Sequence, residues 1–452
     1  MKGPFLRTLV VLAAALGLGA YIYFVESKRP AKEEKAKDKV FAGFKDTRPA
    51  VKEITIARPA ETLRLGKGSD GWRLLAPQSV AADSGEVDAL LSGLETMEVQ
   101  DVVSATPGDL GQYGLATPRT TVSLAGGAAQ GLSLLLGDKT PDGSAVYAKL
   151  PAAPRVFTVA TFAAAAFDKK PFDLRDRGLL HAKRDEVKTL EVVSPGETYA
   201  LTREAGGEWT FTRPLATRAA RWPVDGLLGA LEALRMDAVA AEDAADLKPY
   251  GLDHPAYRVS LGLDDGTSRV IEIGGPAGEK KHHAREASTR LVAVIPDALV
   301  DDLAKGMKEL RAKRLLDVAA YEVQGFDVQA GGAKKTYARA SAKDKEGTDV
   351  YTWKRTAPAA ADLETNKVQD ALFLIGGVEA DAFVDQPGPP EQYGLGAPAL
   401  RLDLRYENGK PPVWLELGNK DGAWYARRAG DQVVLKIPPA KADELLKAFT
   451  GI

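Results

Sequence analysis

Cysteine is absent from the 452-residue chain, and histidine occurs only four times. Without cysteine, the chain can form no disulfide, no thiolate zinc site and no cysteine nucleophile. An excess of one charge is also lacking, because 60 basic side chains stand against 62 acidic ones. The chain therefore has no surplus of basic groups to neutralise nucleic-acid phosphates. Its 45% of apolar residues exceeds what disordered chains carry, so the sequence indicates a folded protein.

The usual catalytic motifs are missing too. The sequence contains no Gly-x-x-x-x-Gly-Lys-Ser/Thr phosphate loop, no Gly-x-Gly-x-x-Gly opening a helix, no Gly-x-Ser-x-Gly elbow and no His-Glu-x-x-His. We therefore predict a non-enzymatic protein with no cofactor and with no catalytic, cofactor-binding or metal-binding residue.

A long apolar run is present near the N-terminus. Residues 8–25 carry no charge, and the 21 residues from Phe5 to Val25 would form a helix of about 31 Å, enough to cross the hydrocarbon core of a bilayer. The aromatic side chains near its end, Tyr21, Tyr23 and Phe24, suit a membrane interface. We predict a cytoplasmic tip and transmembrane anchor at residues 1–25. A cleaved signal peptide is the competing interpretation.

The orientation of this anchor rests on the basic residues that flank it. Lys2 and Arg7 favour a cytoplasmic N-terminus, whereas the basic residues after the run favour the opposite. We expect a single-pass protein with a cytoplasmic N-terminus and with its body on the outer side of the membrane. Residues 26–50 are rich in charge and are predicted to be a solvated linker, with a helical continuation of the anchor as the alternative.

Three copies of one sequence pattern follow the linker. The string Tyr-Gly-Leu-x-x-Pro begins at Tyr113, Tyr250 and Tyr393. A tryptophan precedes each copy by 40 or 41 residues, a proline stands five residues after that tryptophan, and an apolar-Gly pair follows the tyrosine. The landmarks are Trp72, Trp209 and Trp353, then Pro77, Pro214 and Pro358, then Leu136-Gly137, Ile273-Gly274 and Leu417-Gly418. Their constant order and spacing predict a tandem repeat of one structural unit.

The first copy predicts strands at residues 53–57, 62–65, 72–75, 121–124, 132–136, 146–149 and 156–159, with a hairpin turn at 66–71. A helix with one apolar face is expected between the third and fourth of these strands, with Ser84 as its N-cap. The face consists of Val87, Leu91, Leu94 and Met97, matched by Val224, Leu228, Leu231 and Leu234 and by Val368, Leu372, Ile375 and Val378.

The Tyr-Gly-Leu-x-x-Pro string is expected to turn the chain, since glycine permits a positive φ and proline favours an extended residue before it. We expect its tyrosine to pack over the turn and to bond through its hydroxyl group to the backbone. Short helices at 296–306 and 438–449 are expected to close the second and third copies.

This order of elements predicts the α+β class: an N-terminal transmembrane helix followed by three tandem, mainly antiparallel α+β repeat units. Each unit is expected to contain three strands, a helix, four strands and a closing helix. The predicted boundaries are 51–186, 187–322 and 323–452.

A few residues invite a functional interpretation, and each has a plainer one. His282 and His283 are adjacent on an expected strand, so they would face opposite sides and could not easily share a metal ion. His254 is expected to be an exposed turn residue. The other features are the repeated aromatics, expected to be core rather than a groove; the acidic cluster Glu242, Asp243 and Asp246, expected to be a solvated loop; and the basic run 305–314, expected to be a solvated helical face.

The repeated turn, the three units and the apolar N-terminal run together make the chain resemble a bacterial family known as domain of unknown function 4340. The resemblance covers nearly all of the chain and implies a membrane-anchored protein, often encoded beside an ABC-2-type transporter and a gliding-motility-related protein. Together with the expected orientation, it implies a single-pass protein of the bacterial inner membrane with its body in the periplasm. It implies an accessory role near an export system, with transporter subunits as partners, and it supplies no catalytic residue.

Three functions follow as hypotheses. The first is a membrane-tethered extracytoplasmic protein that binds a transporter or its cargo. The second is a cell-envelope hydrolase, which would need an ionisable cluster present in one repeat and missing from the others. The third is a structural spacer or adhesion array with no small-molecule ligand.

Overall fold

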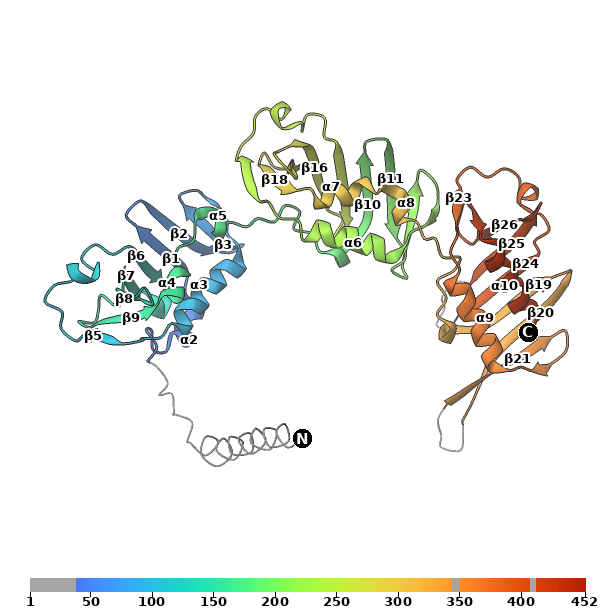
Figure 1. Ribbon diagram of the computed structural model, residues 1–452, viewed down its shortest axis with the longest axis horizontal. Helices are drawn as coiled ribbons and strands as arrows, with labels where there is room; N and C mark the ends of the chain where they lie inside the picture. Colours follow the sequence, from blue (N-terminus) through green and yellow to red (C-terminus); the bar gives the residue numbers. More distant parts are fainter. Residues whose placement is uncertain (1–37, 344–348, 407–411) are drawn as a thin grey trace, which may run out of the picture. The chain divides into compact units, whose positions relative to one another are not determined.

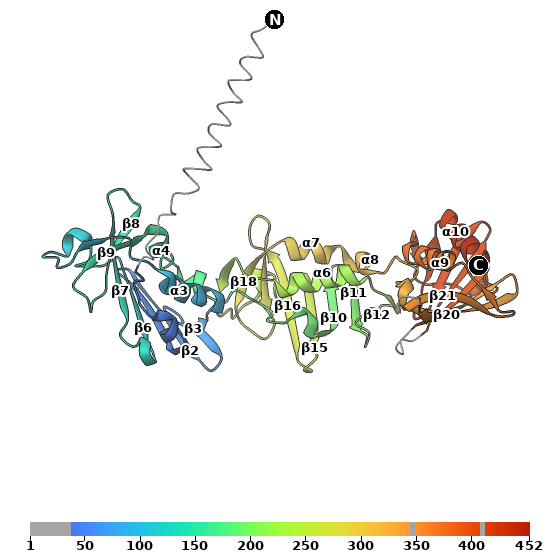
Figure 2. The same cartoon turned by 90° about the horizontal axis from the view of Figure 1, so that it is seen from below.

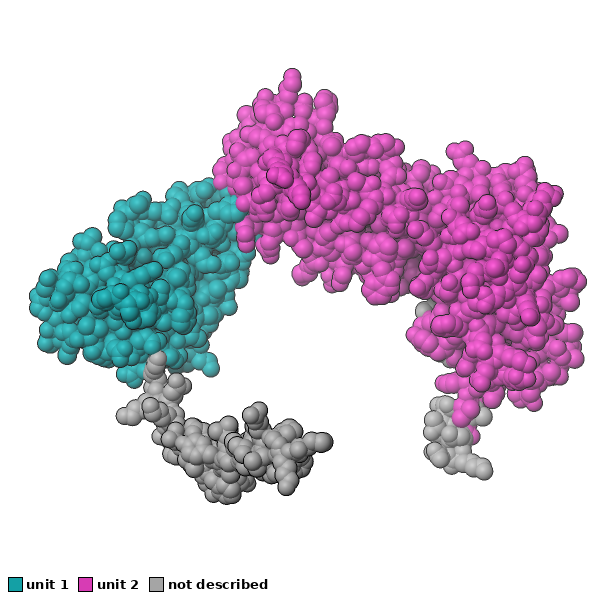
Figure 3. Space-filling view, in the orientation of Figure 1, with its two compact units in different colours: residues 1–176 teal, residues 177–452 magenta. Residues whose placement is uncertain are grey.

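The computed structural model describes residues 38–343, 349–406 and 412–452, so the predicted anchor lies outside the described residues. The described chain contains three nine-stranded sheets (Figure 1). It divides into two compact units at Asp176 and Arg177, of which the first holds one sheet and the second holds two (Figure 3). Among the described helices, none is both long enough and apolar enough to cross a membrane.

Every neighbouring pair of strands in the first sheet is antiparallel, in the order β4-β3-β2-β1-β6-β7-β8-β9-β5. The chain runs outward from β1 to β4 at one edge, passes through helix α3 and places β5 at the other edge. It then returns to the centre with β6 and runs outward again to β9. The elements are β1 (Glu53–Arg58), β2 (Glu61–Gly68), β3 (Gly71–Ala76), β4 (Val80–Ala81), α3 (Ser84–Thr96), β5 (Val102–Ser104), β6 (Thr120–Ala125), β7 (Ser133–Lys139), β8 (Ala145–Lys149), β9 (Val156–Ala160), α4 (Thr161–Ala165) and α5 (Pro171–Leu174).

The other two sheets repeat this strand order. The second repeat consists of β10 (Val187–Ser194), β11 (Glu197–Arg203), β12 (Trp209–Arg213), β13 (Thr217–Arg218), α6 (Arg221–Glu232), β14 (Ala238–Ala241), β15 (Tyr257–Leu263), β16 (Ser268–Pro276), β17 (Lys281–Glu286), β18 (Val292–Pro296), α7 (Ala298–Ala304) and α8 (Gly306–Leu310). The third consists of β19 (Val323–Ala330), β20 (Ala333–Lys343), β21 (Asp349–Ala357), β22 (Ala361–Asp362), α9 (Thr365–Gly377), β23 (Ala382–Val384), β24 (Leu400–Tyr406), β25 (Val413–Lys420), β26 (Ala423–Arg428), β27 (Val434–Ile437) and α10 (Pro439–Thr450).

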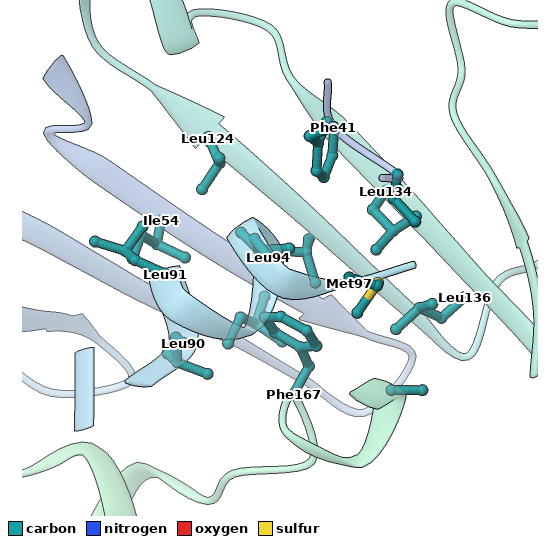
Figure 4. Close-up of a cluster of buried hydrophobic side chains, with 14 of the residues drawn as sticks. Phe41, Ile54, Leu90, Leu91, Leu94, Met97, Leu124, Leu134, Leu136 and Phe167 are labelled. Atoms are coloured by element: carbon teal, nitrogen blue, oxygen red, sulfur yellow. The ribbon is translucent and has the colours of Figure 1, made fainter. Parts of the chain in front are cut away.

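Each core lies between one face of a sheet and its helices. Ile54 and Ile56 of β1 alternate with outward residues and are fully buried, as are Leu63 and Leu65 of β2. In the first repeat, the apolar face of α3 closes over these strands (Figure 4). Figure 2 shows α6, α7 and α8 along one face of the second sheet. The helix faces predicted from the sequence are buried in all three repeats.

The N-cap of α3 differs from the prediction. Asp83, not Ser84, occupies this position, and its carboxylate accepts hydrogen bonds from the backbone N–H groups of Gly85 at 2.9 Å and Glu86 at 3.2 Å. Asp83 takes the cap because it has the extended backbone that an N-cap requires, while Ser84 is already helical.

The end of the predicted linker belongs to the first repeat. Val40, Phe41 and Phe44 join its core, and Val40 N–H donates to the carbonyl of Met97 at 3.0 Å. Helix α2 (Phe44–Thr47) follows, and the Arg48 guanidinium pairs with Asp88 and Glu95 of α3. The linker was predicted from its many charged residues, and this criterion overlooked the three apolar residues that the fold buries.

Equivalent segments precede the other two sheets. Gly178 bridges Arg235 after α6, and Arg314 bridges Glu379 after α9. Leu179 and Leu180 are buried, as are Leu315 and Leu316. Each sheet is thus preceded by a short lead-in segment, and the first two of the predicted repeat boundaries, 186 and 322, lie after these lead-ins.

The fold is mainly β. Four strands, not three, precede each central helix, and one strand directly follows it at the opposite edge. The closing helix of the second repeat is also broken, since Gly306 adopts φ +67° and separates α7 from α8.

Candidate binding groove

The Tyr-Gly-Leu-x-x-Pro turn is built alike three times. Its glycines, Gly114, Gly251 and Gly394, adopt φ between +65° and +67°, as the sequence predicts. The glycine of each apolar-Gly pair lies against the turn, and because it lacks a side chain it leaves room for the carbonyl oxygen of the turn tyrosine. A Cβ added at Gly137, Gly274 or Gly418 would lie 2.1, 2.3 or 2.4 Å from that oxygen.

Each turn tyrosine also packs edge-on against an aromatic residue of a neighbouring strand. The pairs are Tyr113 with Tyr147, Tyr250 with His283, and Tyr393 with Tyr425, each with ring centroids 5.1 Å apart. The hydroxyl oxygen of Tyr393 accepts a hydrogen bond from Gly388 N–H at 3.2 Å, which confirms the expected bond to the backbone in the third repeat.

His283 is therefore the second repeat's version of a packing aromatic. The neighbouring His282 has its Nδ1 3.3 Å from the carbonyl of Gly274, and its Nε2 lies 3.3 Å from Asp297. Over the residues that the structure describes, no three His, Asp or Glu side chains gather in a way that could hold a metal ion.

The remaining features considered in the sequence have structural roles. His254 is an exposed bend residue, as expected. Asp243 pairs with Arg290 at 2.7 Å, and Asp246 accepts from Lys248 N–H, so both belong to an exposed loop. Trp209 and Trp353 are buried core residues, and Trp72 packs partly buried against its core.

The basic run 305–314 does not form one solvated helical face. Arg311 is 6% exposed, its guanidinium lies 3.8 Å from the ring centroid of Phe383, and its Nη1 pairs with Asp385 at 2.7 Å. The run leaves the helix at Leu310, so Arg311 points into the junction between the second and third repeats.

A second buried arginine strengthens this junction. The side chains of Arg428 and Asp431 are fully buried and form an ion pair. Arg428 also donates to the carbonyl groups of Ala312 and Arg314, which precede the third sheet. Asp431 accepts from Arg218 N–H at 2.9 Å, and Gln432 exchanges two hydrogen bonds with the backbone of Ala216. Burial lowers the pKa of Arg428, while Asp431 opposes that shift.

Paired arginines also cross the outer faces of two sheets. In the second repeat, Glu272 on β16 bonds Arg258 on β15 and Arg285 on β17. In the third, Glu416 bonds Arg401 and Arg427 at 2.7 Å each. Thr121, Leu135 and Lys149 occupy this register in the first sheet. Such cross-strand ion pairs stabilise a sheet, and here they satisfy a nearly buried carboxylate.

A groove of ≈590 Å³ runs between α9 and α10 in the third repeat, a size within the range of ligand sites. Ala371, Leu374, Val378 and Ala448 supply its apolar walls. Phe373 stands at its edge and is 80% exposed. Sequence analysis missed this site, because the periodic face of α9 marks the core and does not show which part of the helix stays uncovered.

Charged side chains border the groove unevenly. Lys367 bonds Glu364 at 2.9 Å, and Lys441 bonds Glu444 at 2.9 Å. Lys447 and Asp370 also line it, so three basic groups face two acidic ones. The site can therefore hold an apolar group together with an acidic one.

The tandem nine-stranded sheets define the chain as a mainly β protein built from three repeats. The model of the domain of unknown function DUF4340 matches residues 72–217 and 209–398. The chain belongs to this family. The two matches begin at Trp72 and Trp209, one repeat apart, as the internal repetition requires.

No curated protein matches the chain. Among solved structures, the DNA polymerase III subunit beta of Pseudomonas aeruginosa is 8% identical, with 85% of this chain and 92% of that chain covered and a TM-score of 0.17. A Ca²⁺-stabilised adhesin with which an Antarctic bacterium binds ice is 10% identical, with 87% and 83% covered and a TM-score of 0.08. At such TM-scores, neither likeness bears on the fold or function of this chain.

Proposed function

We propose that the protein is a membrane-anchored, extracytoplasmic accessory protein that binds a component of an ABC-type export system. The groove of the third repeat carries the binding part of this proposal, because an apolar cleft beside an exposed phenylalanine is typical of an interaction site. The apolar run from Phe5 to Val25 supports an anchor in the bacterial inner membrane. The family resemblance supports the association with an exporter.

Affinity capture from solubilised membranes tests the partner. The full chain should recover ABC transporter subunits, and Phe373→Asp should reduce their recovery about tenfold, since a charge in an apolar contact costs more than about 1.4 kcal/mol. Trp222→Asp is the matched control, because Trp222 on α6 is equally exposed but lies in another repeat. Repeated capture without any transporter subunit would contradict the proposal.

Protease accessibility tests the topology separately. Exposed loops of the three repeats should be cut by external protease once the outer envelope is opened, while a cytoplasmic marker stays intact. Protection of these loops until the inner membrane is lysed would place the body in the cytoplasm.

A further inference from the structure

Arg311 is buried at the junction between the second and third repeats, yet two of its nitrogens lack a hydrogen-bond acceptor. Nε and Nη2 are both buried without a partner among the residues that the structure describes. Phe383 covers one face of the guanidinium, and Asp385 pairs with Nη1 at 2.7 Å. The N–H groups of Nε and Nη2 lie in the guanidinium plane, so the stacked ring cannot accept from them. Leaving two donors of a buried cation unmet is costly.

Arg428, which is buried at the same junction, shows how the fold satisfies such a group. Its Nε pairs with Asp431, its Nη1 donates to the carbonyl of Arg314, and its Nη2 donates to the carbonyl of Ala312 at 3.0 Å. Every nitrogen of this guanidinium therefore has an acceptor. The two missing acceptors are thus particular to Arg311 and are not a general property of the junction.

Two other arginines of the third repeat show which group fills the edge formed by Nε and Nη2. Arg401 donates from these two nitrogens to the two carboxylate oxygens of Asp403, at 3.1 and 3.0 Å. Arg427 donates from the same two nitrogens to Glu416, at 3.1 and 2.7 Å. The parallel N–H groups of this edge match the oxygen spacing of a carboxylate or a phosphate. An oxyanion is therefore the ligand that the Nε–Nη2 edge of Arg311 fits.

The charges buried at the junction also favour an anion. Burial lowers the pKa of Arg428, Asp431 opposes this shift, and the cations of Arg218 and Arg311 lower the pKa further. The three guanidinium groups thus lie near enough to repel one another. Asp431 is fully buried, whereas the carboxylates that pair with Arg218 and Arg311 are 66% and 52% exposed. Water screens those exposed charges, so the interior of the junction keeps a positive surplus.

We propose that the Nε–Nη2 edge of Arg311 binds a small oxyanion, a free carboxylate or phosphate group, at the junction of the second and third repeats. Two oxygens of the ligand accept from Nε and Nη2, while Nη1 keeps its pairing with Asp385. Because this edge is covered, the ligand enters by displacing side chains around the exposed Asp385. It strengthens the junction, since Arg311 follows α8 of the second repeat and Phe383 lies on β23 of the third.

NMR spectra of the arginine Nε–H groups in the full chain, in detergent, test this site directly. Loss of one signal in Arg311→Lys assigns the Nε–H of Arg311. Titration with acetate or with inorganic phosphate, at an ionic strength held constant with chloride, should shift this signal saturably. The Nε–H signals of Arg401 and Arg428 should stay in place, because their acceptors are already present. The probe that binds more tightly identifies the natural group as a carboxylate or a phosphate, and no saturable shift with either overturns the proposal.

Arg311→Lys separates the Nε–Nη2 edge from its charge, because lysine keeps the positive charge and lacks the paired N–H groups. The unaltered chain should gain thermal stability with the anion, and this variant should bind at least about tenfold more weakly and lose most of the gain. Arg401→Lys is the matched control. Its edge is filled by Asp403, so its response to the anion should equal that of the unaltered chain. An equal response in Arg311→Lys would exclude this edge as the binding site.

Asp385→Asn keeps the test decisive if Arg311→Lys does not fold. Its carboxylate repels a second anion at the same guanidinium, so the variant should bind the oxyanion about tenfold more tightly at low salt. Asp362→Asn removes an exposed carboxylate elsewhere in the third repeat and is the control. Unchanged or weaker binding in Asp385→Asn would mean that the anion does not share the guanidinium of Arg311. None of these results touches the proposed partner, which is tested by capture from membranes.

Discussion

At the scale of single residues, one close approach fixes each repeat. The tyrosine carbonyl of the turn presses on the glycine of the apolar-Gly pair, and the turn glycine needs a positive φ. The sequence showed that these residues recur, but it did not show that they touch, since 24 or 25 residues separate them. Recurrence reveals a constraint, and only the fold reveals its steric cause.

Gly274→Ala tests this constraint. The added methyl group would lie 2.3 Å from the Tyr250 carbonyl oxygen, so the turn or the strand must shift, and we expect a loss of about 1–3 kcal/mol in the free energy of unfolding. Gly229→Ala in α6 of the same repeat is the control. No atom lies within 4 Å of its new Cβ, and it should be neutral or stabilising by up to about 1 kcal/mol. Urea denaturation compares the two, and equal effects would contradict the steric explanation.

At the scale of elements, periodicity predicted most of each repeat. The strands expected at 53–57, 121–124, 146–149 and 156–159 exist with bounds within one residue. Buried and partly exposed residues alternate in the first three, while the last is a short, fully buried run. The short edge strands were missed, since the two residues of β4 cannot show a period. The groove was missed as well, because the pattern of α9 marks only its buried face. The lead-in segments of the second and third sheets did leave a signal, since residues 174–180 and 310–316 share the pattern Leu-Arg-x-basic-x-Leu-Leu.

The cap of α3 gives a prediction at this scale. Asp83→Ala should lower the unfolding free energy of the first repeat by about 1 kcal/mol, because two N–H groups of the first turn lose their acceptor. Asp83→Asn should restore most of it, and Ser84→Ala should change little. Thermal denaturation distinguishes these outcomes. If Ser84→Ala lowered the unfolding free energy more than Asp83→Ala, the N-cap would be Ser84, as the sequence predicted.

At the scale of the whole molecule, the second and third repeats form one compact unit, and the buried Arg428–Asp431 pair lies at their junction. This pair has no counterpart in the landmarks of the repeat, so pattern analysis could not find it. Its arginine belongs to the third repeat, yet it bonds carbonyl groups of the segment that leads out of the second.

Arg428→Ala should therefore loosen the junction. Asp431 would remain buried without its partner, which costs about 3–5 kcal/mol, and the two repeats should unfold in separate calorimetric transitions. Replacing the pair by Met and Leu should recover much of the lost stability, because neither charge is then stranded. Arg401→Ala on the outer sheet face is the control and should leave a single transition, because Glu416 keeps Arg427 as a partner. A single transition in Arg428→Ala would contradict this role.

The short strands at the sheet edges have a consequence for biogenesis. Three copies of one topology on one chain keep similar strands at high local concentration, so strands of one copy could pair with those of another or of a second molecule. Every described sheet ends in strands of two to four residues: β4, β13 and β22 on one side, and β5, β14 and β23 on the other. Edges this short offer few free backbone groups. The short length that kept these edge strands from being predicted therefore protects the chain against misassembly and fibre growth.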